Sequence, residues 1–226
     1  KLWNMEHRNR FDEAGGFMTW TGFIWSRAGQ NDVDTGQYDS LQYIFAGKSA
    51  SCMMTRKAFN EVGGFDESFE ILGEETLLAW RFWLRNHKVM FVPTATGYHA
   101  FNTKFKPPEK YYTSQRVNFN GCRNYLSMLI QCLGRSHLWI VPIHAGIWLF
   151  ASIAMLITGK RKQGVNILRG LFYVLRNLKT ILGKRSQIQS GRVVDEKSLW
   201  RSIHHEAPRG YAWKRFCRYL SIGLHG

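Results

Sequence analysis

The sequence predicts an α/β unit followed by an α-helical region that associates with a membrane, and three observations lead to this prediction. Short apolar segments alternate with helical patterns over residues 46–101, as in α/β domains. Residues 138–158 form an apolar run without a formally charged side chain. The net charge of +15 is also one-sided, because residues 1–100 hold 10 basic and 12 acidic residues and the remainder holds 21 and 4. A basic half of this kind indicates a polyanionic partner.

The first helix of the α/β unit is predicted from its two ends. Residues 49–54 are small and sulfur-bearing, and we expect them to form a short buried strand. Thr55 then caps a helix that runs to about Val62, because its hydroxyl can accept a hydrogen bond from an N–H of the first turn. Gly63 and Gly64 end this helix where a left-handed backbone is needed.

A second helix is expected to begin at Glu74 and Glu75, whose acidic side chains suit the positive end of a helix. It directs an apolar face inward, formed by Leu77, Leu78, Trp80 and Leu84. A strand over residues 89–92 follows, and His99 comes a few residues later. The pattern therefore predicts a carboxylate pair and a histidine at neighbouring loop ends.

The run "GGFDESFEILGEETLLAWR" followed by "VPTATGYH" resembles the second half of the catalytic domain of family 2 glycosyltransferases. This resemblance implies the GT-A fold, here as a partial domain over residues 1–134 that lacks its N-terminal nucleotide-binding half. It also implies an inverting enzyme that takes a sugar from a nucleotide-diphosphate donor. The chain departs from the family pattern at Glu75, where the family usually has Asp, and at Leu77, where it usually has an acid.

Sugar transfer requires a base, because an acceptor hydroxyl is a poor nucleophile at neutral pH. The resemblance implies that Glu75 is this base, with Glu74 beside it. It further implies that His99 binds a divalent cation, Mn²⁺ or Mg²⁺, that would neutralise the leaving diphosphate. The alternatives are that the two glutamates only compensate the helix dipole and that His99 is a surface or core histidine. Asp32 and Asp34 have Asp-x-Asp spacing, but we interpret them as a solvated turn.

Basic and small residues are candidates for substrate binding. The resemblance and the affinity of Arg and Lys for phosphate oxygens favour Gly47, Lys48, Ser49, Arg81, Lys104, Arg116 and Arg123. The alternative for Lys104 is a solvated basic loop, and for Arg116 and Arg123 it is ordinary surface charge on an amphipathic helix over residues 111–133. That helix is expected to bend near Gly121.

The region 135–226 is predicted to be helical, basic and membrane-associated. Residues 138–158 are long enough to enter a hydrocarbon layer about 30 Å thick, and the alternative is a buried core helix. Residues 164–185 form a basic amphipathic helix, which is typical of a membrane interface. The expected membrane contacts are Trp139, Trp148, Phe150, Leu168, Leu171, Phe172 and Leu175.

The remaining predictions concern location and partners. The four cysteines form no C-x-x-C pair, so we expect reduced thiols facing the cytosol. Nucleotide sugars are cytosolic and basic segments also favour that side, so we expect a re-entrant or monotopic helical hairpin with the catalytic side cytoplasmic. The expected partners are a nucleotide-diphosphate sugar, a glycan or lipid-linked acceptor and an anionic membrane surface. The lack of an initiator Met and of a nucleotide-binding half predicts a fragment that is inactive alone. Nucleic acid is not expected, although a basic nucleic-acid-binding module and a non-catalytic membrane adaptor remain alternatives.

Overall fold

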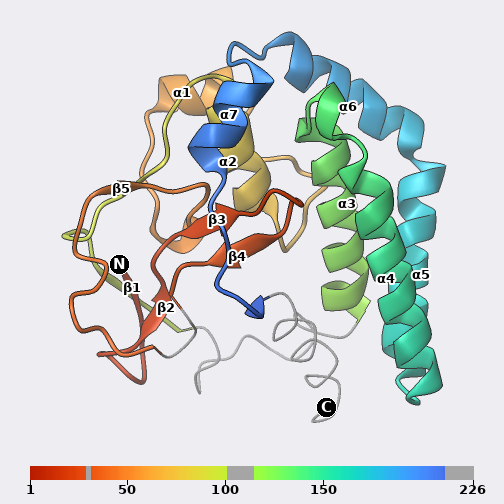
Figure 1. The fold of residues 1–226 in the computed structure, drawn as a ribbon, viewed down its shortest axis with the longest axis horizontal. Coiled ribbons are helices and arrows are strands. Elements are labelled where there is room, and N and C mark those ends of the chain that lie inside the picture. The colour runs from red at the N-terminus through yellow and green to blue at the C-terminus, as the bar shows by residue number, and fades with distance from the viewer. Residues whose placement is uncertain (29–31, 101–114, 212–226) are drawn as a thin grey trace. The chain divides into compact units, whose positions relative to one another are not determined.

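A computed structural model describes residues 1–28, 32–100 and 115–211 of the chain (Figure 1). Contacts between residues divide the chain into two units. Unit 1 contains residues 1–66, 75–110 and 193–206, and unit 2 contains residues 67–74, 111–192 and 207–226. Unit 1 is mixed α/β and unit 2 is helical, which confirms the general fold class. The domain boundary predicted at residue 134 stays a prediction, and the contacts place the described residues 115–134 with the later helices.

The three-stranded sheet of unit 1 is formed by segments far apart in the sequence. Strand β1 (Leu2–Asn4) pairs antiparallel with β2 (Phe11–Glu13) and parallel with β7 (Gly97–His99). The parallel register places Asn4 opposite His99. Strand β1 therefore joins the other two strands of the sheet.

Unit 1 also contains two further strand pairs. Strands β3 (Gly16–Met18) and β4 (Ile24–Ser26) form an antiparallel hairpin, and β5 (Gln42–Tyr43) pairs antiparallel with β6 (Met90–Phe91). A strand was predicted over residues 89–92, and its paired part is only two residues long.

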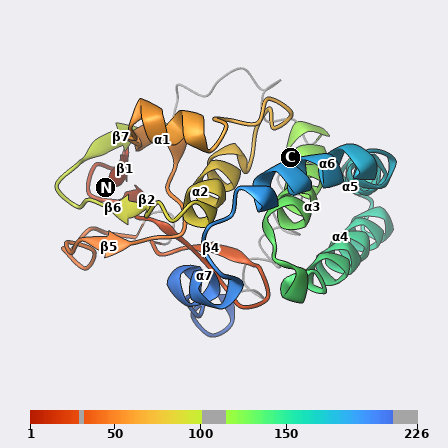
Figure 2. The same cartoon turned by 90° about the horizontal axis from the view of Figure 1, so that it is seen from above.

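Both predicted helices of the α/β unit are confirmed. In α1 (Arg56–Glu61) the Thr55 hydroxyl accepts a 3.2 Å hydrogen bond from the Ala58 N–H, and Gly63 and Gly64 follow with φ of +81° and +66°. Helix α2 (Glu74–Leu84) buries the predicted residues Leu77, Leu78, Trp80 and Leu84. In unit 1, α2 and α7 (Glu196–Ile203) lie on opposite sides of the β3–β4 hairpin (Figures 1 and 2).

The prediction of a buried strand over residues 49–54 is wrong. Residues Ser49–Ser51 form a 3₁₀ turn, and residues 52–54 have no strand partner among the described residues. Met53 is 98% exposed. The backbone next to β3 is instead supplied by Phe45 and Ala46, since the Gly16 N–H donates to the Ala46 carbonyl at 2.7 Å and Phe45 donates back at 2.9 Å. Residues 49–54 are therefore free to line a cavity.

Unit 2 is a set of packed helices. It begins with a π-helical turn (Gln115–Phe119) that leads into α3 (Asn120–Cys132), so the helix predicted over residues 111–133 changes its winding just before Gly121. A 3₁₀ turn (Arg135–His137), α4 (Ile140–Ile157), α5 (Arg161–Arg176) and α6 (Leu178–Ser190) follow. Helices α3, α4 and α5 lie side by side (Figure 1). The single helix predicted over residues 164–185 is thus two helices with Asn177 between them.

The crossing of α4 and α5 depends on one small residue. The Ser152 hydroxyl of α4 donates a 2.8 Å hydrogen bond to the Gly164 carbonyl of α5. A Cβ atom on Gly164 would lie 2.8 Å from Leu156 Cγ and 2.9 Å from the Ser152 carbonyl oxygen. The shared core of unit 2 consists of Cys122, Leu126, Ile130, Ala151, Met155, Ile167, Val174 and Ile181.

Candidate functional site

The start of α2 is built by an unusual turn. Leu72 and Gly73 both have left-handed backbones, with φ of +69° and +92°, directly before Glu74 and Glu75. A left-handed conformation is unfavourable for leucine, and such strain is typical of functional sites. The turn therefore marks the first residues of α2 as candidates for function.

Two side chains of α3 hold this turn. The Asn124 amide donates hydrogen bonds of 2.8 and 2.9 Å to the carbonyls of Ile71 and Leu72. Arg123 donates to the Ser68 carbonyl at 2.6 Å and to the Asn124 side chain at 2.8 Å. Both residues are buried, so their contacts explain an Arg-Asn pair at this place better than phosphate binding does.

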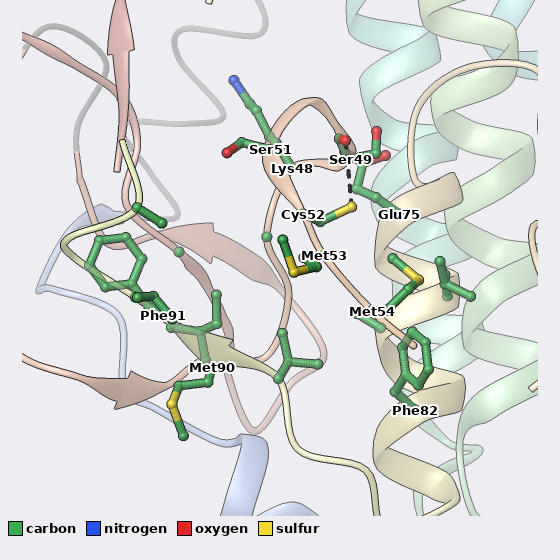
Figure 3. Close-up of a pocket in the computed structure, with 18 of the residues that line it drawn as sticks. Lys48, Ser49, Ser51, Cys52, Met53, Met54, Glu75, Phe82, Met90 and Phe91 are labelled. Atoms are coloured by element: carbon green, nitrogen blue, oxygen red, sulfur yellow. Dashed lines mark hydrogen bonds between the residues drawn. The ribbon is translucent and has the colours of Figure 1, made fainter. Parts of the chain in front are cut away.

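Unit 1 contains a cavity of about 480 Å³, of the size that small-molecule sites commonly have (Figure 3). One part of its lining is polar, with Lys48, Ser49, Ser51, Cys52 and Glu75. Another part is apolar and rich in methionine, and includes Met53, Met54, Phe82, Met90 and Phe91. A ligand with a polar and an apolar part matches this lining.

Glu75 and Cys52 lie close together at the polar part of the cavity (Figure 3). The Cys52 thiol donates a 3.5 Å hydrogen bond to the Ser49 carbonyl. Burial, and then the negative charge of Glu75, raise the pKa of the Cys52 thiol. The pKa of the Cys52 thiol therefore depends on the charge of Glu75, the proposed catalytic carboxylate.

Asp12 connects the cavity wall with His99. Its Oδ2 atom lies 2.6 Å from Lys48 Nζ and 2.8 Å from His99 Nδ1. The Asp12 side chain is only 4% exposed, so these two partners take the place of water around its carboxylate oxygen. Glu75 lines the cavity and His99 does not, but Lys48 lines it and reaches His99 through Asp12.

Of the predicted site residues in unit 1, Gly47, Lys48, Ser49 and Glu75 line the cavity. Glu74 does not, and its Oε2 atom is buried without a hydrogen bond from the described residues. Arg81 is also away from the lining, because its guanidinium donates to the Gly64 carbonyl at 3.2 Å and to Asp66 at 3.3 Å. Its contacts hold the turn that follows α1 and do not support substrate binding.

The other predicted substrate contacts belong to unit 2 or are not described. Arg116 pairs with Glu70 at 3.2 Å on an exposed surface, and Arg123 is buried as above. Lys104 lies outside the described residues.

Asp34 differs from its predicted role. Asp34 was interpreted as part of a solvated turn, but its carboxylate accepts hydrogen bonds from Lys1 Nζ at 2.8 Å and from the Trp3 indole at 2.9 Å. Burial alone would raise the pKa of Asp34, and these hydrogen bonds lower it.

The predicted membrane contacts separate into two groups. The side chains of Trp139, Phe150, Leu168, Phe172 and Leu175 are exposed. Trp148 and Leu171 instead pack against the core of unit 2. The helix Arg135–Ile157 is long and apolar enough to cross a membrane by length and composition, and 28% of its most apolar stretch is buried.

A divalent-cation site is not complete in the part of the chain that the structure describes. No group of three His, Cys, Asp or Glu side chains among the described residues could hold one ion. His99 is close to Asp12, but the same carboxylate oxygen is already bound to the Lys48 ammonium. These residues alone do not fit a metal centre, and no chemical step is assigned to an ion below.

A mixed α/β unit with a polar cavity and a carboxylate at the start of a helix defines a candidate transferase or hydrolase. The family model described as "Glycosyltransferase like family 2" matches residues 4–136, which is more than half of the chain. The chain therefore belongs to the family 2-like glycosyltransferases, as predicted, and contains a glycosyltransferase domain. Enzymes of this family commonly use divalent cations. A comparison with curated protein sequences finds no match.

Sequence reasoning missed Asp12, which is the residue that joins Lys48 to His99. It lies in a three-residue strand within a region whose pattern shows neither helical nor strand periodicity. The one available signal is the pair of acids Asp12 and Glu13 directly after a buried phenylalanine, because acids in a buried strand need partners.

Proposed function

We propose that the protein is an inverting glycosyltransferase that moves a sugar from a nucleotide-diphosphate donor to a glycan or lipid-linked acceptor. The observation that carries this proposal is the placement of Glu75 in the lining of the 480 Å³ cavity, within a domain of the glycosyltransferase family. A soluble nucleic-acid-binding module is not favoured, because this family membership gives no support for it.

The proposed reaction is a single displacement. The Glu75 carboxylate accepts the proton of the acceptor hydroxyl while the hydroxyl oxygen forms a bond to the anomeric carbon. The bond from that carbon to the diphosphate oxygen breaks on the opposite face, and the nucleoside diphosphate leaves with the bonding electrons. Attack opposite the leaving group inverts the anomeric centre. Lys48 and Ser49 are proposed to bind and orient the substrates beside Glu75.

The lining of the cavity favours an acceptor with an apolar part. Met53, Met54 and Met90 are flexible and polarizable, and methionine adapts well to apolar ligands of varied shape. Met53 is almost fully exposed, so it contributes little to the core. We infer that Met53→Ala raises the KM for a lipid-linked acceptor and leaves the free energy of unfolding unchanged.

The decisive test is Glu75→Gln in the full-length protein. Loss of a general base lowers kcat by at least about 100-fold, whereas donor binding, measured by calorimetry with the nucleotide-diphosphate sugar, is unchanged. Glu67→Gln, an exposed substitution of the same type, is the matched control and keeps full activity. Full activity of the Glu75→Gln variant would remove Glu75 as the base.

The proposal includes a divalent cation, Mn²⁺ or Mg²⁺, bound by His99 together with ligands outside the described residues. His99→Ala is expected to raise the Mn²⁺ concentration at which transfer and Mn²⁺ binding are half-maximal. Unchanged binding of Mn²⁺, followed by its electron paramagnetic resonance signal, would contradict this role for His99.

We also propose that unit 2 binds a membrane, with the catalytic domain on the cytoplasmic side. Exposed apolar side chains follow one face of α4, at Ile143, Phe150, Ile153 and Ile157, which is unusual for a buried core helix. The tight turn at Gly159 leads back into α5, where Val165, Leu168, Phe172 and Leu175 are also exposed. A helical hairpin with these faces suits a monotopic membrane contact. Flotation of the full-length protein with anionic liposomes tests it.

A further inference from the structure

Helix α5 carries an exposed apolar stripe next to a polar stripe, and within the polar stripe Arg169 and Arg176 are exposed, Tyr173 is half-buried and Asn166 is buried. Exposed apolar side chains recur at three- and four-residue steps at Val165, Leu168, Phe172 and Leu175. A polar stripe lies one position further along the chain and consists of Asn166, Arg169, Tyr173 and Arg176. Such spacing places each set on one side of an α-helix.

The polar stripe of α5 lines a cavity of about 420 Å³ in unit 2, together with Phe119 and Phe172. The rings of Phe119 and Tyr173 meet edge to face with centroids 5.9 Å apart. The Arg123 guanidinium lies 5.2 Å from the first ring and 5.1 Å from the second. These contacts fix both rings, so the aromatic wall of the cavity is preorganised.

The cavity also carries uncompensated positive charge. Arg169 and Arg176 both line it, and neither forms an ion pair with a carboxylate of the described residues. They are seven residues apart, which is about 10.5 Å along a helix, so two flexible guanidinium groups can converge on one anion between them. Arginine suits phosphate because its planar fork can donate two hydrogen bonds to phosphate oxygens.

We propose that this cavity binds the phosphate headgroup of an anionic membrane phospholipid. The phosphate lies between Arg169 and Arg176, and the glycerol and upper acyl chains lie on Phe172 and Tyr173. The adjacent apolar stripe at Leu168 and Leu175 continues the path of the acyl chains into the membrane. This inference rests on the proposed membrane association of unit 2, and it adds a specific headgroup site to a general apolar contact.

The test uses the full chain and a soluble short-chain lipid, so that binding is measured without a membrane. Dihexanoyl phosphatidic acid is titrated below its micelle concentration, with dihexanoyl phosphatidylcholine and inorganic phosphate as comparison ligands. The double variant Arg169→Gln, Arg176→Gln is expected to bind the acid at least ten-fold more weakly. The matched control Arg161→Gln, Lys179→Gln removes the same charge outside the cavity lining and is expected to change binding less than two-fold.

Three outcomes would overturn the headgroup site. If both double variants bound the phosphatidic acid equally weakly, the lipid would be attracted by the general positive charge of the protein and not by this cavity. Equal binding of phosphatidylcholine would mean that the phosphomonoester charge is not recognised. Inorganic phosphate that binds as tightly as the lipid would point to a site for a soluble anion. Circular dichroism of each variant checks that the helices are intact.

A second measurement separates this site from membrane association as a whole. Phe150→Ser with Ile157→Ser changes exposed residues of α4 and is expected to lower liposome flotation without altering binding of the short-chain lipid. If no variant and no lipid composition gives flotation, the membrane proposal fails. If flotation persists but does not depend on Arg169 and Arg176, only the headgroup site fails.

Discussion

Lys48 donates a 2.6 Å hydrogen bond to Asp12, which lies 36 positions earlier in the chain. The same Asp12 oxygen, Oδ2, also lies 2.8 Å from His99 Nδ1. Because Asp12 is buried, it fixes the loop that carries Lys48 to the sheet that carries His99. This connection holds Lys48 in position in the polar part of the cavity lining.

Lys48→Met is expected to lower the free energy of unfolding by about 2 kcal/mol, because it leaves a buried carboxylate with one partner fewer. Urea denaturation measures the loss. Lys57→Met on the exposed face of α1 is the control and should change it by less than about 0.5 kcal/mol. Adding Asp12→Asn to Lys48→Met should cost less than the sum of the single variants. Additive losses would show that the two residues do not interact.

Cys52 is expected to react slowly with thiol reagents at neutral pH although the residue as a whole is exposed. Partial burial of the thiol, and then the negative charge of Glu75, raise its pKa above the ordinary value of about 8.5, and the thiolate is the reactive form. Glu75→Gln removes a negative charge, lowers this pKa and should speed the reaction with Ellman's reagent at pH 7.5.

The controls for Cys52 come from the same chain. Burial raises the pKa of Cys122 to about 12, so Cys122 should stay unreactive in the folded protein. Cys217 is replaced by serine in all variants. Glu74→Gln should leave the rate for Cys52 unchanged, and an equal acceleration by both glutamine variants would contradict the placement of Glu75 beside Cys52.

Asn124→Ala should loosen the turn before α2. It removes two hydrogen bonds to the carbonyls of Ile71 and Leu72, and Leu72 needs them because its left-handed backbone is strained. We expect the free energy of unfolding to fall by about 2 kcal/mol. Hydrogen exchange of residues 68–73 should also accelerate. Asn60→Ala on exposed α1 should change neither quantity, and unaltered exchange at residues 68–73 in Asn124→Ala would refute the supporting role.

Two helical glycines should respond oppositely to alanine. Gly183→Ala in α6 meets no atom within 4 Å and should stabilise the protein by up to about 1 kcal/mol, the difference in helix propensity. Gly164→Ala should destabilise it, because the new Cβ would lie 2.8 Å from Leu156 Cγ and 2.9 Å from the Ser152 carbonyl oxygen. Thermal unfolding of the two variants checks the signs. Stabilisation by both would mean that α4 and α5 do not cross closely at Gly164.

The sequence was sufficient where structure depends on neighbours in the chain. Thr55, Gly63 and Gly64 act within a few residues, and they predicted both ends of α1. The apolar positions of α2 repeat with helical spacing, so its buried face could also be predicted. The family motifs allowed the domain type to be recognised from the same stretch.

The sequence was insufficient where structure depends on distant partners. A three-residue strand such as β1 is too short to show periodicity. It is stabilised by pairing with β7, which lies next to it in the sheet but at residues 97–99 of the sequence. Asp12 could not be distinguished from a surface acid, since its partners Lys48 and His99 are remote in sequence. Residues 49–54 have the composition of a strand, but Phe45 and Ala46 occupy the available backbone partner.

The return of residues 193–206 to unit 1 has a consequence for biosynthesis. The Trp200 ring stacks on Trp20 with centroids 5.9 Å apart, and the His205 N–H donates to the Met18 carbonyl at 2.9 Å. These partners leave the ribosome only after most of the chain has been translated. Until then, the apolar face of the β3–β4 hairpin that these residues cover stays exposed to solvent. We therefore expect chaperones to bind a nascent chain that is stalled before residue 193.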